Sequence, residues 1–63
     1  MEKLKNLRES LNLRQEDLAN KLSVNRSTIA KWETGEAMPR ADKLLALASI
    51  LKCSVDDLLY KNM

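Results

Sequence analysis

The chain has 63 residues, and its 11 Lys and Arg residues against 9 Asp and Glu residues give a formal net charge of +2. A chain of this length forms one domain with a small core. A net charge so close to zero neither indicates nor excludes a nucleic-acid partner, so that question depends on where the cations are placed. With one Cys and no His, the sequence excludes an internal disulfide and a Cys/His zinc site. No apolar run approaches the ~20 residues of a membrane-spanning helix. We therefore expect no metal, no cofactor, no membrane span and a cytoplasmic location.

Hydrophobic spacing predicts five helices and no strand. The first is expected over about 2–11 and is followed by Asn12, a residue that tolerates the left-handed backbone of a helix end. The other helices are expected over about 15–22, 25–34, 40–51 and 55–60. Gly35 closes the third helix, and short turns join all five into a compact all-α domain. The apolar positions that mark the helices are Leu4, Leu7, Leu11, Leu18, Ala19, Leu22, Ile29, Trp32, Leu44, Leu47, Ala48, Leu51, Val55, Leu58 and Leu59.

Residues at the helix boundaries support three of the helix starts, most weakly that of the second helix. Asn25 is a favourable N-cap for the third helix. Ser54 followed by Asp57 forms a capping-box pattern at the fifth. Arg14 is a poor cap for the second helix, although Asp17 at its third position complements the helix dipole.

The second and third helices are separated only by Ser23 to Asn25, and such a short link makes them cross steeply, as in a helix-turn-helix. The second helix of that unit can lie in the DNA major groove. In the third helix, Ser27, Lys31 and Thr34 fall on one face at i, i+4 and i+7, with Arg26 beside them.

This small and cationic face suits duplex DNA. Arg26 can offer guanine two donors, Lys31 can reach a base acceptor or a phosphate, and Asn25 and Thr34 can donate to phosphates. Spacing alone leaves a second interpretation open, in which Arg26 and Lys31 only solvate an exposed helix.

The run LRQEDLANKLSVNRSTIAKWETG, followed by Pro39 and then by LLALASILKCSVDDLL, resembles the Cro/C1-type (XRE) helix-turn-helix family from about Leu4 to Leu59. The resemblance implies a five-helix, lambda-repressor-like DNA-binding domain over 1–63, with the motif at about 15–34. It also implies a sequence-specific transcriptional regulator, most often a repressor, that is encoded by a bacterium or a phage and binds operator DNA as a dimer.

The resemblance further implies roles for single positions. The resemblance assigns DNA contacts to Gln15, Arg26, Ser27 and Lys31, and the face described above adds Asn25 and Thr34. Gln15 would contact a phosphate and brace the recognition helix, while Arg8 and Glu33 would form a structural ion pair. Two residues depart from the family pattern: Ser23 stands where glycine is common, and Arg14 where a serine or threonine cap is common. Serine in a left-handed conformation would cost roughly 1 kcal/mol.

Other functions are weighed against this one. An interaction module such as an antitoxin or adaptor could use the same fold, but acidic or bulky apolar residues would then be expected at positions 26, 27 and 31. An enzyme is not expected, because catalytic His, a phosphate loop and paired acids are missing. Trp32 and Cys53 are expected to serve the core rather than a site.

A symmetric homodimer on a palindromic operator is expected, since one recognition helix makes few base contacts. The tentative interface is an apolar patch of Ile50, Leu59 and Tyr60, small enough for dimerisation to be weak without DNA. The alternative is that these are scattered apolar side chains on the surface, with no role in dimerisation. No small-molecule effector domain is expected within this sequence.

Overall fold

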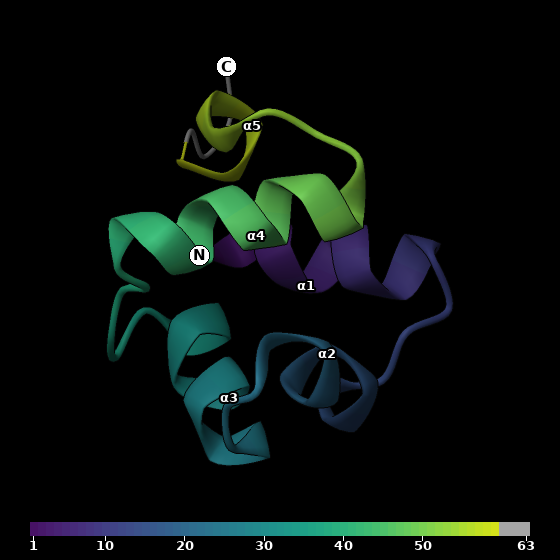
Figure 1. Ribbon diagram of the computed structural model, residues 1–63, viewed down its shortest axis with the longest axis vertical. Coiled ribbons are helices and arrows are strands. Elements are labelled where there is room, and N and C mark those ends of the chain that lie inside the picture. The colour runs from purple at the N-terminus through teal and green to yellow at the C-terminus, as the bar shows by residue number, and fades with distance from the viewer. Residues whose placement is uncertain (60–63) are drawn as a thin grey trace.

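The computed structural model describes residues 1–59, and within them the chain forms five α-helices and no strand (Figure 1). The helices are α1 (Glu2–Ser10), α2 (Gln15–Leu22), α3 (Arg26–Thr34), α4 (Ala41–Leu51) and α5 (Val55–Leu59). The all-α prediction is therefore confirmed, and within residues 1–59 the helix ends differ from the predicted ones by a residue at most, while the predicted end of the fifth helix at residue 60 lies outside the described residues. Asn25 is the N-cap of α3, as predicted, and Arg40, at the predicted start of the fourth helix, is the N-cap of α4.

Left-handed backbone ends several helices. Asn12 has φ 59° after α1, Ser23 has φ 58° after α2, and Gly35 has φ 85° after α3. Ser23 thus adopts the strained conformation that the sequence led us to expect. Lys52 ends α4 in the same way with φ 57°, a feature that the sequence did not indicate.

Aspartates at the third helical position help to cap the N-termini of α2 and α5. The Ser54 hydroxyl accepts the Asp57 N–H at 3.0 Å, and Asp57 accepts the Ser54 N–H at 3.2 Å, so the predicted capping box is present. At α2, Asp17 accepts the Arg14 backbone N–H at 2.9 Å and also its Nε–H at 3.3 Å. The poor cap residue is therefore compensated by the carboxylate three positions later.

The core lies where the five helices meet. Its buried apolar residues are Leu4, Leu18, Ala19, Leu22, Ile29, Trp32, Leu47, Ala48, Leu51 and Leu58. Trp32 is 5% exposed and belongs to this core, as predicted. Cys53 is half-buried against it, and burial raises the pKa of its thiol. Leu11 is exposed and Leu44 only half-buried, so these two predicted apolar positions lie outside the buried core.

The helices of the predicted motif lie together at one end of the molecule, and α5 lies at the other end of the long axis (Figure 1). α3 packs against α2 and α1, while α4 packs against α2 and α5. This arrangement fixes α3 from behind and leaves its other face open. Across residues 1–59, none of the helices has both the length and the apolar character that a membrane crossing needs.

Candidate nucleic-acid interface

The outward face of α3 carries the predicted recognition residues. Arg26, Ser27, Lys31 and Thr34 are all exposed, as is the cap residue Asn25. Ile29 and Trp32, on the opposite side, are 0% and 5% exposed. Because α3 is anchored by this buried pair, its small and cationic face is held outward on a rigid helix.

The cations on this face are available to a partner. Within residues 1–59, no hydrogen bond or ion pair engages the side chain of Arg26 or Lys31. The Asn25 side chain makes no capping bond, so its amide is available too. The Thr34 hydroxyl donates to the Lys31 carbonyl at 3.2 Å, so it must turn from that carbonyl before it can donate to a phosphate.

Behind this face lies a polar network centred on Glu33. The structure brings the predicted pair together: Arg8 Nε donates to Glu33 Oε2 at 2.6 Å, and Arg8 Nη2 to Oε1 at 3.3 Å. Their side chains are 8% and 5% exposed. The Glu33 hydrogen bond, opposed by burial, raises the pKa of Arg8 above its already high usual value. Arg8 Nη1 also donates to the Leu13 carbonyl at 2.7 Å, which ties this network to the chain just before α2.

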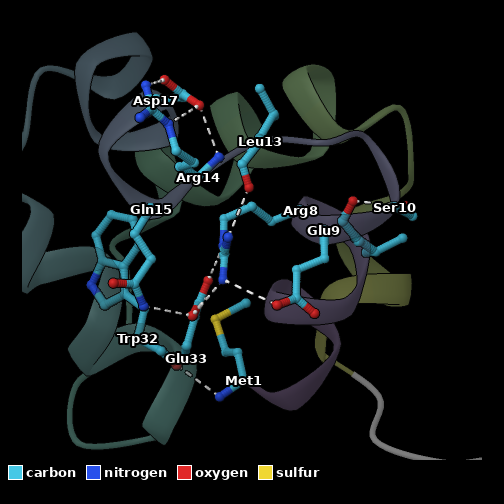
Figure 2. A network of polar contacts seen from close by, with 11 residues as sticks. Met1, Arg8, Glu9, Ser10, Leu13, Arg14, Gln15, Asp17, Trp32 and Glu33 are labelled. Carbon is cyan, nitrogen blue, oxygen red and sulfur yellow. Dashed lines mark hydrogen bonds and ion pairs between the residues drawn. The ribbon is translucent and has the colours of Figure 1, made fainter.

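Gln15 joins the network from the first turn of α2. Its Nε2 donates to Glu33 Oε1 at 2.9 Å, and Figure 2 shows Arg8 and Gln15 converging on that carboxylate. Gln15 therefore braces α3. A side-chain amide has two protons and an acceptor oxygen, so Gln15 retains one donor for a phosphate.

Two hydrogen bonds were not predicted from the sequence, because the acceptor of each is a backbone carbonyl. The Met1 amino group donates to the Trp32 carbonyl at 2.8 Å (Figure 2), and Lys43 Nζ donates to the Leu22 carbonyl at 2.9 Å. Both place a cation at the C-terminal end of a motif helix, where the helix dipole favours positive charge. The only signal for Lys43 was its place near the start of α4, where a lysine opposes the dipole of its own helix.

The proposed dimer residues are placed unequally. Leu59 is 45% exposed, whereas Ile50 is half-buried and packs against the core; Tyr60 lies outside the described residues. Leu59 and Met38 line one groove of about 430 Å³ at the C-terminal end of α3.

Among residues 1–59, no group of three or more His, Cys, Asp or Glu side chains could hold a metal ion.

Comparison with known proteins identifies the family and relatives of this chain. A helix-turn-helix family model matches residues 4–58. The chain is 41% identical over 58 residues to the HTH-type transcriptional activator BcrR of Enterococcus faecalis, covering 92% of this chain and 28% of BcrR. It is 38% identical over 62 residues to repressor protein C2 of Salmonella phage P22, covering 98% of this chain and 29% of C2. This chain thus spans less than a third of either relative.

A solved structure shares the fold. The P22 c2 repressor, crystallised in complex with the synthetic operator 9T, superposes with a TM-score of 0.90 at 36% sequence identity. The match covers 97% of this chain and 92% of that chain.

Proposed function

Because the chain belongs to the helix-turn-helix family, we propose that residues 1–63 form one DNA-binding domain that places α3 of its motif, at about 15–34, in the major groove of duplex DNA. The observation that carries this function is the outward face of α3. Arg26 and Lys31 are exposed there without an intramolecular partner in the described part of the chain, beside the small Ser27.

Each residue of the face has a role in this proposal. Arg26 reads guanine with two donors, and Ser27 is small enough to let α3 approach the bases. Lys31 reaches a base acceptor or a phosphate. Asn25 and Thr34 donate to phosphates, and Gln15 does so with the amide proton that Glu33 does not use.

The domain is proposed to regulate transcription in a bacterium or a phage, in its cytoplasm. Relatives are named both activator and repressor. Repression is the simpler of the two, because a domain on an operator blocks other proteins by its volume alone. We assign the chain no catalytic activity, since the α3 face carries groups that bind and none that react.

Two copies are proposed to bind a palindromic operator. One recognition helix provides too few base contacts for a useful specificity ratio, whereas a two-fold dimer presents two helices to half-sites about 10–10.5 bp apart. The copies would meet through Leu59 and Ile50, and the third proposed contact, Tyr60, lies outside the described residues. The patch is small, so DNA should promote dimerisation.

Selection of bound duplexes from a random DNA pool tests this function. The parent should enrich one palindromic sequence. Arg26→Ala should lose roughly 1–3 kcal/mol of discrimination at one base pair, whereas the control Lys5→Ala, which removes an exposed cation of α1, should keep the parental preference. If no duplex is enriched, or if Arg26→Ala, Lys31→Ala and their double variant all bind as the parent does, the DNA-binding face is wrongly assigned.

A further inference from the structure

The turn between α2 and α3 receives a cation from a helix outside the motif. Lys43 of α4 donates its ammonium to the Leu22 carbonyl at 2.9 Å, in a partly buried setting. Leu22 is the last residue of α2, and the carbonyls of a last helical turn have no partner within their own helix. Lys43 therefore satisfies one of these groups and places positive charge where the α2 dipole favours it.

The position of Lys43 is unfavourable for its own helix. It is the third residue of α4, which begins at Ala41, and a cation in the first turn opposes the helix dipole. Nothing within α4 explains a lysine at this place. The favourable interaction of Lys43 is instead with the C-terminal end of α2, across the interface between α2 and α4.

The end of α4 provides a matched comparison inside the same molecule. After α2, Ser23 has φ 58°, with its N–H bonded to the Asn20 carbonyl at 3.3 Å and the Val24 N–H to Ala19 at 3.0 Å. After α4, Lys52 has φ 57°, and the two equivalent bonds are also 3.3 and 3.0 Å long. The two ends are alike in backbone. Yet within residues 1–59 only the end of α2 receives a lysine from another helix.

The end of α2 is also the one that matters for the motif. Ser23 holds a left-handed conformation without the freedom of glycine, and three residues later α3 begins with Arg26. A small change at this turn would swing the start of α3, which carries the residues proposed to read bases.

We infer that Lys43 is a positioning residue for DNA recognition: its ammonium clamps the strained turn of the motif and so fixes the angle at which α3 leaves α2. The inference rests on the proposed function for its effect on DNA, but the clamp itself is a property of the free protein. It can therefore be tested with and without DNA.

The first experiment uses the free protein. Lys43→Met keeps the aliphatic chain and removes the ammonium, and Lys43→Arg restores a cationic donor. Amide hydrogen exchange should speed up at Ser23 and Val24 in Lys43→Met by at least about tenfold, the lower end of the loss for a hydrogen bond to a charged group. Exchange at Lys52 and Cys53 should change far less, and Lys43→Arg should restore most of the protection. Equal acceleration at both helix ends, or none at Ser23 and Val24, would overturn the clamp.

The second experiment separates the clamp from a phosphate contact. On a selected duplex, at a temperature where both proteins are folded, Lys43→Met should lower the ratio of specific to non-specific affinity severalfold. The slope of log affinity against log salt should stay parental. A slope smaller by about one, with unchanged exchange at Ser23, would place Lys43 on a phosphate instead. Lys5→Met controls for the lost charge.

A coupling measurement completes the test. Ser23→Gly relieves the left-handed turn, so Lys43→Met should cost less exchange protection at Val24 in that background than in the parent. Strictly additive effects would show that lysine and turn are independent, against the inference. If the parent binds no duplex while the exchange pattern holds, the proposed function fails and the clamp stands.

Discussion

Gln15, the first residue of α2, donates its side-chain amide to Glu33 near the end of α3, with 2.9 Å between Nε2 and Oε1. The same carboxylate accepts both Nε and Nη2 of Arg8. One buried glutamate thus joins three helices, and its charge is balanced by one arginine. The orientation of α3 therefore depends on side chains of α1 and α2 as well as on its own residues.

We predict that Glu33→Gln strongly destabilises the domain. Removing one partner of a buried ion pair leaves the other charge uncompensated, at a cost of about 3–5 kcal/mol. A domain of this length has only roughly 3–9 kcal/mol in total, so the variant should lose a third or more of its stability and melt at a markedly lower temperature. Thermal melting measures this. Glu36→Gln, at an exposed position, is the matched control, and an unchanged midpoint for Glu33→Gln would rule the pair out as a stabiliser.

How much of the fold and of the candidate site could be predicted from the sequence depends on the kind of contact. Ile29 and Trp32 follow helical spacing, so the buried side of α3 and its open face could be predicted from periodicity. The pairing of Arg8 with Glu33 came from the family resemblance. Lys43 donates to a backbone carbonyl of Leu22, and every residue has such a carbonyl, so no side-chain pattern marks the acceptor. Its partner is fixed only by how α4 packs on α2.

The dimer patch shows a similar limit. Ile50 lies off the main apolar stripe of α4 in the sequence, yet it packs against the core because neighbouring helices cover more than one stripe. Leu45, which the sequence interpretation did not single out, is 66% exposed. Periodicity locates the centre of a buried face, while its width is set by the neighbouring helices.

Salt dependence should distinguish the roles of the two cations on α3. Each phosphate contact contributes about 0.9 to the slope of log affinity against log salt on duplex DNA. Lys31→Ala should reduce the slope by about one if Lys31 meets a phosphate, and should keep it while relaxing preference at one base pair if Lys31 meets a base. Titration of a selected duplex at several salt concentrations measures both quantities. Parental affinity, slope and preference together would remove Lys31 from the interface.

Acid should weaken the start of α5. The Ser54 backbone N–H, and then the Ser54 hydroxyl, hold the pKa of Asp57 below its usual range. A carboxylate with a lowered folded-state pKa adds stability at pH values above its unfolded pKa, near 3.9, and that stability is lost as the pH falls through the folded value. The loss therefore lies below about pH 4.

Denaturant unfolding at pH 7 and at about pH 3 measures this loss. Asp57→Asn should be less stable than the parent at pH 7, and the difference should shrink at the lower pH because the parental carboxylate is then becoming protonated. Asp56→Asn, at the neighbouring exposed position, should leave the parental profile in place. A difference between Asp57→Asn and the parent that stays constant with pH would contradict the assignment of Asp57 as a charged cap.

The remaining prediction concerns the dimer on DNA. Ile50→Glu would disturb the core against which Ile50 packs, so Leu59, at 45% exposure, is the better site for a charge. Leu59→Glu should change melting far less than a core substitution would, since Leu59 is exposed and is not among the buried core residues. It should abolish cooperative occupation of the palindrome, because each bound dimer would bring two buried carboxylates together.

Sedimentation with and without a selected duplex measures the effect of Leu59→Glu. The parent should be mainly monomeric alone and bind as two copies on the duplex, whereas the variant should occupy half-sites independently. Leu45→Glu, on α4 at 66% exposure, is the matched control and should bind as the parent does, because Leu45 lies outside the proposed patch. If Leu45→Glu breaks cooperativity and Leu59→Glu does not, the copies meet through α4 instead. If a single copy occupies the palindrome, no dimer forms on it.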